Sequence, residues 1–149
     1  MNKSYPKPRR WFPKNPNKYK GDPNNIIARS SWEVKCFGFM DRNPDVLEWH
    51  SEEIVIPYKS PVDGQYHRYF PDIWARIKSS DGRIKSYLIE IKPFAQTQEP
   101  QIKKRITKQY INEVCTYGIN TAKWKAAKTY CFERGWEFMI LTEKQLFGE

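Results

Sequence analysis

The chain has 149 residues, a length that fits one domain with a substantial buried core. Hydrophobic residues make up 39% of the sequence and aromatic residues 15%, so most of the chain is expected to fold. The formal net charge of +9 favours an anionic partner, either a nucleic acid or an acidic membrane surface.

The cysteines and the apolar runs indicate the compartment. Cys36, Cys115 and Cys131 are odd in number and form no CxxC pair, which argues against a disulfide framework or a zinc site and favours a reducing environment. No apolar run is long enough to cross a bilayer, and the N-terminus has no signal-peptide core. We therefore expect a soluble, intracellular protein.

The N-terminal segment, residues 1–25, is expected to form a basic, proline-rich arm outside the core of a folded domain that spans residues 26–149. Residues 1–21 hold seven Lys or Arg residues, no acid and four prolines, which interrupt regular structure. Two interpretations stay open: a solvated disordered tail, or an arm that follows DNA and uses its aromatic side chains for stacking. The second interpretation predicts phosphate contacts from Lys7, Arg9, Arg10 and Lys14.

The first half of the folded domain predicts one helix followed by strands. Ser30 and Glu33 have the spacing of a capping box, so a helix is expected to begin at Ser30 and to stop before Pro44. The composition of the following segments and the turn residues between them predict a series of strands. In chain order these are strands at 46–49 and 52–58, a turn at 60–65, a strand at 66–77, a hairpin turn at 80–83 and a strand at 85–92.

The second half predicts two helices, a strand and a short final helix. Pro100 can begin a helix that has an apolar stripe. Gly118 is expected to end this helix. Thr121 then caps a second helix that runs to Arg134, and a strand at 136–141 follows. Because helices separate two strands, we expect a crossover connection and a mixed central sheet flanked by helices, which is an α/β fold.

Acidic and basic side chains interrupt two of the most apolar strand segments. Asp72 lies in the segment 66–77, and Glu90 and Lys92 lie at the end of the segment 85–92. Alternation along a strand places Glu90 and Lys92 on one face, about 7 Å apart, and pairing of the two strands would bring Asp72 against Glu90. Adjacent carboxylates repel each other unless a cation or proton lies between them, and Mg²⁺ prefers such ligands together with water and phosphate oxygens. Lys92 can then orient a hydroxide or stabilise charge that develops on phosphorus.

This arrangement resembles the motif of the PD-(D/E)XK nuclease superfamily. Here the motif reads Pro71-Asp72, 17 intervening residues, and Glu90-Ile91-Lys92. Both halves lie in strand-like segments with a turn between them, and a helix follows. The resemblance implies a restriction-endonuclease-like fold with an αβββαβ core, which matches the order of elements predicted here.

The superfamily also has an acidic residue on its first helix, and Glu33 is the matching candidate. Two roles stay open for Glu33: a capping-box residue, or a member of the active site on the helix face that meets the sheet. The competing candidates for the third acid are expected on an exposed strand face or a hairpin, and they are Glu48, Glu52 and Glu53.

A closer resemblance extends from about Ile27 to Phe147. The segments RSSWE, NPDVLEW, SEEIVIPYKSPVDGQYHRYFPD, LIEIKP and KWKAAKTYCFERGWEFMILTE are similar to the head completion nucleases of T4-like phages, which in turn resemble TnsA-type transposon endonucleases. The resemblance implies a DNA endonuclease that helps to complete DNA-filled phage heads, with Mg²⁺ as cofactor and Mn²⁺ as a substitute. DNA is the implied substrate, and phage head or portal proteins are the implied partners. The implied location is the host cytoplasm during assembly, with association with the virion left open.

The residues that match the motif carry the implied roles. Asp72, Glu90 and the backbone carbonyl of Ile91 would hold the metal, Glu33 would join them directly or through water, and Lys92 would act at the attacked phosphate. The basic residues that follow the motif are either phosphate contacts or a solvated face, and they are Lys103, Lys104, Arg105 and Lys108.

Two other functions compete with the nuclease hypothesis. A non-catalytic DNA-binding structural protein of the phage head would retain the nuclease fold, but the intact set of Asp72, Glu90 and Lys92 argues against decay of the site. A basic RNA-binding module is the weaker alternative, because the sequence has neither an RNP-like aromatic strand motif nor a GXXG loop.

Overall fold

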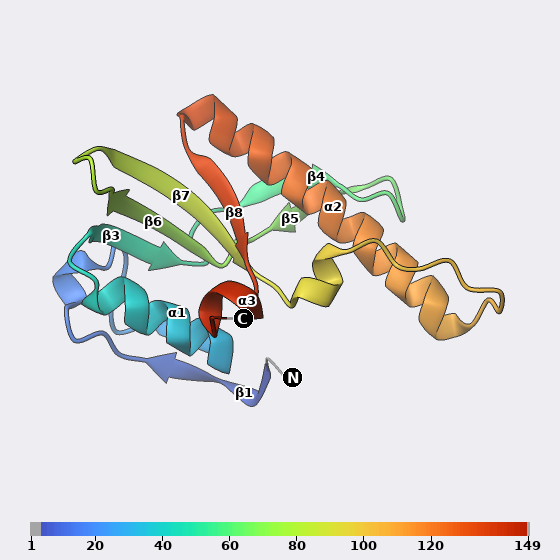
Figure 1. Ribbon diagram of the computed structural model, residues 1–149, viewed down its shortest axis with the longest axis horizontal. Helices are drawn as coiled ribbons and strands as arrows, with labels where there is room; N and C mark the ends of the chain where they lie inside the picture. Colours follow the sequence, from blue (N-terminus) through green and yellow to red (C-terminus); the bar gives the residue numbers. More distant parts are fainter. Residues whose placement is uncertain (1–3, 149) are drawn as a thin grey trace.

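The computed structural model describes residues 4–148 and places helices on both sides of a central sheet (Figure 1). In chain order the elements are β1 (Ser4–Trp11), η1 (Pro16–Lys18), β2 (Ile26–Ser30), α1 (Ser31–Arg42), β3 (Val46–Ser51), β4 (Ile56–Lys59), β5 (Tyr66–Tyr69), β6 (Ile73–Lys78), β7 (Ile84–Ile91), η2 (Phe94–Thr97), α2 (Lys108–Arg134), β8 (Glu137–Leu141) and α3 (Glu143–Leu146). The predicted α/β class is confirmed, and the helix-flanked sheet is that of a restriction-endonuclease-like domain.

The central sheet has four strands in the order β3-β6-β7-β8. β6 pairs antiparallel with β3 and with β7, and Gly82, at φ 86°, makes the tight turn between β6 and β7 without the steric cost that other residues would meet. β8 pairs parallel to β7, because α2 carries the chain back along the sheet before β8 begins. The predicted mixed sheet and the predicted crossover are therefore confirmed.

The segment predicted as one strand at 66–77 is two strands, so that prediction was wrong. β5 pairs with β4 in a separate two-stranded hairpin, whereas β6 begins at Ile73 in the central sheet. Pro71 lies between them and has no backbone N–H to donate to a strand partner, which explains why the chain changes sheets there. The break leaves Asp72 immediately before β6.

One helix, α2, replaces the two that the sequence predicted; it is 27 residues long and spans Lys108–Arg134. Gly118 does not end it, because a glycine inside a helix costs only about 1 kcal/mol relative to alanine and packing of the neighbouring turns outweighs that cost. The predicted start at Pro100 was also wrong. The side chain of Thr107 caps α2, and Ile102 of the expected apolar stripe is 95% exposed.

Two apolar clusters fill the two sides of the central sheet. Figure 1 shows α1 and α2 on opposite sides of that sheet, so β7 contributes alternate side chains to each cluster. Among the side chains of the α1-side cluster that are no more than 1% exposed are Trp32, Phe37, Trp49, Ile89 and Ile91. The α2-side cluster consists of Ile56, Tyr58, Tyr69, Trp74, Leu88, Trp124, Ala127 and Cys131.

The basic N-terminal segment forms a two-stranded ribbon that packs on the domain. β1 pairs antiparallel with β2, and the ring of Trp11 meets that of Trp49 edge-on, with centroids 5.8 Å apart. Tyr19 is 7% exposed within the α1-side cluster. The prediction that this segment lies outside the core was therefore wrong for the described residues, because burial of its aromatic side chains outweighs the repulsion among its charges. Residues 1–3 of the predicted arm, and residue 149, lie outside the described part of the chain.

Two further observations concern the whole described chain. No helix between residues 4 and 148 is long and apolar enough to span a membrane. The three cysteines are free thiols, and Cys36 and Cys131 are buried in the two clusters, where each packs as a small apolar side chain.

Candidate active site at the end of the central sheet

The two halves of the motif meet at one end of the central sheet. β6 and β7 pair antiparallel with Ile73 opposite Ile89, so Asp72, one residue earlier, lies across from Glu90. Asp72 Oδ2 accepts a hydrogen bond from the backbone N–H of Ile91 at 2.7 Å, which orients the carboxylate at the end of the ladder. The strand register therefore produces the juxtaposition of Asp72 and Glu90 that the sequence predicted.

Glu90 is a buried carboxylate with a side-chain partner on each oxygen. The residue is 6% exposed. Its Oε1 accepts a hydrogen bond from the Tyr69 hydroxyl at 2.7 Å, and its Oε2 lies 3.3 Å from Lys92 Nζ. A buried charge needs hydrogen bonds and an opposite charge to offset its lost hydration, and here a hydroxyl and an ammonium group provide both.

Tyr69 was not anticipated as a residue of the site. It ends β5, three residues before Asp72, and belongs to the α2-side cluster. Burial, followed by the negative charge of Glu90, raises the pKa of Tyr69 far above its ordinary value, so the hydroxyl remains a donor throughout the physiological range. The sequence offered little signal, because only the β4–β5 hairpin folds this ring over Glu90.

Lys123, on α2, is a second residue that sequence reasoning missed. It is half-buried, and its Nζ lies 5.6 Å from the centroid of the Tyr69 ring. Burial lowers the pKa of Lys123 and the positive charge of Lys92 lowers it further, while Glu90 and Asp72 raise it. The ammonium group therefore lies within electrostatic range of the whole motif. Lys123 is far from the motif in sequence and sits among other lysines, so no spacing rule could identify it.

Glu33 has the geometry of a helix-capping residue. Ser30 Oγ accepts a hydrogen bond from the Glu33 N–H at 3.1 Å, and Glu33 Oε1 accepts one from the Arg29 N–H at 3.1 Å, so the predicted start of α1 is confirmed. Glu33 is 4% exposed. Among residues 4–148, no three His, Cys, Asp or Glu side chains form a group that could hold a metal ion, so the structure does not gather Glu33 with Asp72 and Glu90 into such a group.

Of the competing acids, Glu52 contacts the site through its backbone. Its N–H donates to the carbonyl of Asp72 at 3.2 Å, while its carboxylate pairs with Arg29 at 2.9 Å. Its φ of 57° lies in the left-handed region, which costs a non-glycine residue roughly 1–3 kcal/mol and is found where surrounding contacts hold a functional segment in place. Glu48 is held by ion pairs with two basic side chains, and Glu53 is exposed.

The donors at the end of the sheet suit a hard divalent cation. Asp72 and Glu90 supply carboxylate oxygens, and the backbone carbonyl of Ile91 is the next oxygen along β7. Cations of this type are commonly bound by one or two carboxylates, with water and phosphate oxygens completing the coordination shell. The two carboxylates therefore fall within the range of protein ligands that such a cation uses.

The eight basic residues predicted to contact DNA all have exposed side chains. One group lies on β1 and in the loop that follows it, and the other lies before and at the start of α2. Their contact with DNA stays a prediction. The residues are Lys7, Arg9, Arg10, Lys14, Lys103, Lys104, Arg105 and Lys108.

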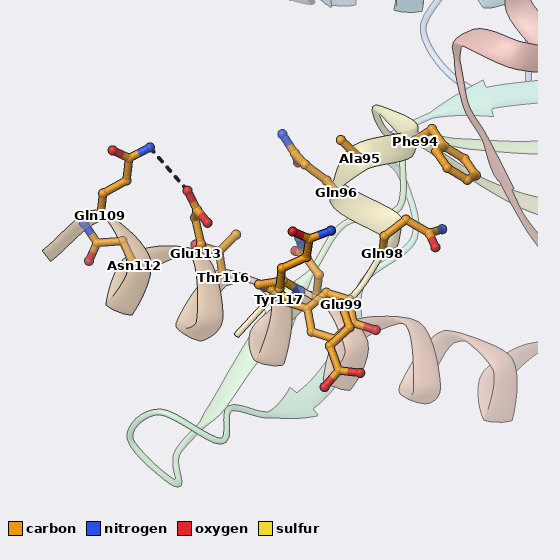
Figure 2. Close-up of a pocket in the computed structure, with 13 residues that line it drawn as sticks. Phe94, Ala95, Gln96, Gln98, Glu99, Gln109, Asn112, Glu113, Thr116 and Tyr117 are labelled. Carbon is orange, nitrogen blue, oxygen red and sulfur yellow. Dashed lines mark hydrogen bonds between the residues drawn. The ribbon is translucent and has the colours of Figure 1, made fainter. Parts of the chain in front are cut away.

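A hollow of about 710 Å³ lies between the segment that follows Lys92 and the first half of α2. Figure 2 shows amide side chains around it, including Gln109, which donates a hydrogen bond to Glu113 at 3.3 Å. Amides both donate and accept hydrogen bonds, as the edges of nucleobases do. The amide residues that line the hollow are Gln96, Gln98, Gln101, Gln109, Asn112 and Asn120.

Comparison with known proteins assigns the family. Residues 43–143 match the family described as TnsA-like endonuclease N terminal. This match covers more than half of the chain and includes Asp72, Glu90 and Lys92, whereas Glu33 precedes it. The chain therefore belongs to the TnsA-like endonuclease family.

A curated relative extends the similarity to almost the whole chain. The chain is 45% identical over 141 residues to the head completion nuclease of Enterobacteria phage T4, and the alignment covers 92% of this chain and 91% of the relative. The resemblance inferred from the sequence segments is confirmed. Together, the family and the relative support a nuclease role.

Proposed function

We propose that the chain is a divalent-metal-dependent DNA endonuclease that hydrolyses phosphodiester bonds during completion of DNA-filled phage heads. The observation that carries the proposal is the pairing of Asp72 and Glu90 across the end of the sheet, with Lys92 Nζ 3.3 Å from Glu90 Oε2. The name of the T4 relative supports the role in head completion. The partners would be DNA and phage head or portal proteins. The place of action would be the host cytoplasm during assembly, with retention in the virion left to experiment.

The described contacts suggest how the site would act. Asp72 and Glu90, with the carbonyl of Ile91, would hold Mg²⁺, or Mn²⁺ in its place, which when bound neutralises phosphate charge and acidifies water. Tyr69 and Lys92 hold the Glu90 carboxylate in one orientation. The Lys92 side chain, 20% exposed, would position the attacking water or stabilise the charge that develops on the pentacoordinate phosphorus. The products would carry a 5′ phosphate and a 3′ hydroxyl.

Glu33 would complete the acidic set, directly or through water, in addition to capping α1. The variant Glu33→Gln separates the two roles, because glutamine can still accept the hydrogen bond from the Arg29 N–H. Capping alone predicts a loss of stability of at most about 1 kcal/mol with normal cleavage. A role at the metal predicts a sharp fall in turnover while the melting temperature barely changes. Full activity would remove Glu33 from the proposed site.

The two basic groups would bind DNA through its phosphates. Each lost phosphate contact reduces the slope of log affinity against log salt by about 0.9, because fewer counterions are released. Since β1 belongs to the fold, neutralising substitutions are preferable to deletion. Lys7→Gln with Arg10→Gln tests one group, and Lys103→Gln with Lys104→Gln tests the other. An unchanged slope would exclude the altered group from the DNA interface.

A non-catalytic DNA-binding structural protein of the phage head is the second candidate. Two observations favour it. Both oxygens of Glu90 already have side-chain partners. In addition, no third acid joins Asp72 and Glu90 in a metal-holding group within the described residues. Such a protein would bind DNA and cut none.

Incubation with linear, nicked, branched and supercoiled DNA, with Mg²⁺ or with EDTA, distinguishes the two candidates. Asp72→Asn and Glu90→Gln keep the side-chain shape but remove the charge that would bind the cation. Each variant should stay folded and bind DNA, and should lose both cleavage and calorimetric Mg²⁺ binding almost completely. Asp45→Asn, on an exposed residue, is the matched control. Cutting at the wild-type rate by either site variant would contradict the nuclease proposal, and an inert wild type would favour the structural role.

A further inference from the structure

Lys123 is held at one place by two aromatic rings. It lies one helical turn from Asn120 and one from Ala127, both of which are buried, so it projects from the packed side of α2. Its Nζ lies 5.7 Å from the centroid of the Tyr58 ring and 5.6 Å from that of Tyr69. One ring comes from each strand of the β4–β5 hairpin, so the helix and the hairpin together position the ammonium group.

Tyr69 connects Lys123 to the motif. The hydroxyl of the same ring donates to Glu90 at 2.7 Å, so the ring that attracts the ammonium group also touches the site carboxylate. The charges of the motif act on Lys123 as well: Lys92 repels it, and Glu90 and Asp72 attract it. Lys92 therefore pairs with Glu90 directly, and Lys123 lies beside the ring that donates to Glu90.

The position is an unfavourable one for an ammonium group without a bound anion. Within residues 4–148, no carboxylate forms an ion pair with Lys123. Half-burial removes part of its hydration, and Lys92 adds a like charge nearby. The contacts with two tyrosine rings offset only part of this cost. An anion bound between the two lysines would relieve both the lost hydration and the repulsion.

We propose that Lys123 is a second cationic residue of the active site and binds a non-bridging oxygen of the phosphodiester that is cut. The inference rests on the proposed nuclease function. The charge balance supports it, because the two carboxylates balance the two lysines. A bound divalent cation would then leave the site positively charged, and the phosphates of the substrate would neutralise it.

The hollow beside α2 offers a path for the strand that carries this phosphate. Buried Asn120 lines the hollow, and Lys123 follows it one helical turn later. The hollow (Figure 2) is lined by the amide side chains together with Glu99 and Glu113, and Phe94, two residues after Lys92, borders it, so a strand lying in the hollow would bring a phosphate toward Lys92 and Lys123. The amides would hold the neighbouring nucleotides by hydrogen bonds.

The variant Lys123→Met tests the charge separately from the packing, because methionine keeps an unbranched stem against the two rings. Single-turnover cleavage at saturating DNA should fall about 10²-fold, the loss typical of one group that stabilises a developing negative charge. Lys123→Arg should recover part of the rate, since guanidinium also binds phosphate. Lys128→Met, at an exposed position of the same helix, is the matched control and should cut at the wild-type rate.

A second measurement uses binding without cleavage. In EDTA, the slope of log affinity against log salt should decrease by about 0.9 in Lys123→Met and remain unchanged in Lys128→Met. A packing role alone predicts a lower melting temperature with an unchanged rate and slope. Either an unchanged cleavage rate or an unchanged slope in Lys123→Met overturns the inference.

The failure of this inference differs from the failure of the proposed function. If the wild type cuts DNA and Lys123→Met cuts it equally fast, the role of Lys123 is wrong and the nuclease proposal stands. If the wild type cuts no DNA with any divalent metal, both proposals are overturned. A slow Lys123→Met variant with a reduced salt slope supports both.

Discussion

Buried carboxylates occur on both sides of the central sheet, and their partners differ. On the α1 side, Asp41 accepts hydrogen bonds from the N–H groups of Lys14 and Asn15, each at 2.9 Å. Glu33 likewise accepts one from a backbone N–H. On the α2 side, Glu90 has side-chain partners only among its described contacts, namely the Tyr69 hydroxyl and the Lys92 ammonium group.

The difference separates Asp41, which holds a chain segment, from Glu90, whose partners are side chains of the proposed site; Asp72 accepts from a backbone N–H and still belongs to that site. A carboxylate that accepts from backbone N–H groups fixes a chain segment, as Asp41 fixes the loop after β1. A carboxylate surrounded by movable polar side chains does little for the backbone and costs desolvation energy, which proteins tolerate mainly at functional sites. Substitutions on the α1 side, Glu33 apart, should therefore change stability, whereas those around Glu90 should change cleavage.

The largest effect is expected on the α1 side, from Phe37→Ala. Phe37 is fully buried, and its ring centroid lies 5.6 Å from that of Trp11 and 5.4 Å from that of Trp49. Removal of the ring should lower the free energy of unfolding by about 3–5 kcal/mol, because the packed aromatic rings cannot close the cavity. Urea denaturation measures the loss. Cleavage per folded molecule should be retained. Loss of cleavage by the folded fraction would contradict the claim that the α1 side serves stability and the α2 side serves cleavage.

Lys92→Met should have the opposite profile. Cleavage should fall by about 10²–10³-fold, because the variant lacks the ammonium group that would stabilise the developing phosphate charge. Mg²⁺ binding by calorimetry should remain, since both carboxylates are intact. Lys85→Met, which also removes an ion pair from β7 but at an exposed position, is the control. Normal cleavage by Lys92→Met would show that the buried charges of the α2 side are structural.

His50 should make the stability of the fold depend on pH without involving the carboxylates. Its ring stacks on Trp74 of the α2-side cluster, with ring centroids 4.9 Å apart. Burial lowers the pKa of His50 to about 4. Between pH 6.5 and 4 the unfolded chain binds a proton that the folded chain does not. Stability should therefore fall as the pH drops through this window, by on the order of 3 kcal/mol in total. Comparison of unfolding free energies for the wild type and His50→Phe isolates this contribution, and parallel pH curves would contradict it.

A smaller effect is expected from Tyr69→Phe, which keeps the ring and removes one hydrogen bond to Glu90. Cleavage should fall roughly tenfold, because the carboxylate loses a hydrogen bond that orients it. A tenfold change in rate corresponds to about 1–1.5 kcal/mol, the free energy of one such bond. Tyr66→Phe, on a residue that is 74% exposed, should have no effect. A larger loss of stability than of cleavage would place Tyr69 among the structural contacts.

The smallest effect is expected from Gly118→Ala in α2. A Cβ at this position would approach only the Pro61 side chain, at 3.6 Å, which is an ordinary contact. The substitution should raise stability by about 0.5–1 kcal/mol without changing cleavage. Gly38→Ala in α1 is the contrast, because there a Cβ would lie 2.7 Å from Arg42 Nη1 and that side chain must move. Thermal denaturation should show a clear gain for Gly118→Ala and a smaller one for Gly38→Ala.

Local chemistry alone determined several boundaries of the fold. Ser30 caps α1, the turn with Gly82 joins β6 to β7, and Thr142 begins α3 with a capping box that includes Gln145. Each of these depends on side chains within a few residues of the backbone groups that they satisfy. The sequence also predicted that Glu90 would face Asp72, because the strand period of two and the short hairpin leave little choice of register.

Contacts between distant segments decided the rest. The N-terminal ribbon packs on the core because Trp11 and Tyr19 contact apolar residues far along the chain. Local charge and proline content do not predict the stability gained from that burial. α2 continued through Gly118 because packing over its whole length outweighed one unfavourable residue. Packing between distant segments likewise places Tyr69 and Lys123 near Glu90. Periodicity describes the faces of one element, but which faces meet depends on the burial of complete surfaces, and that is decided only when the hairpin, the helix and the sheet pack together.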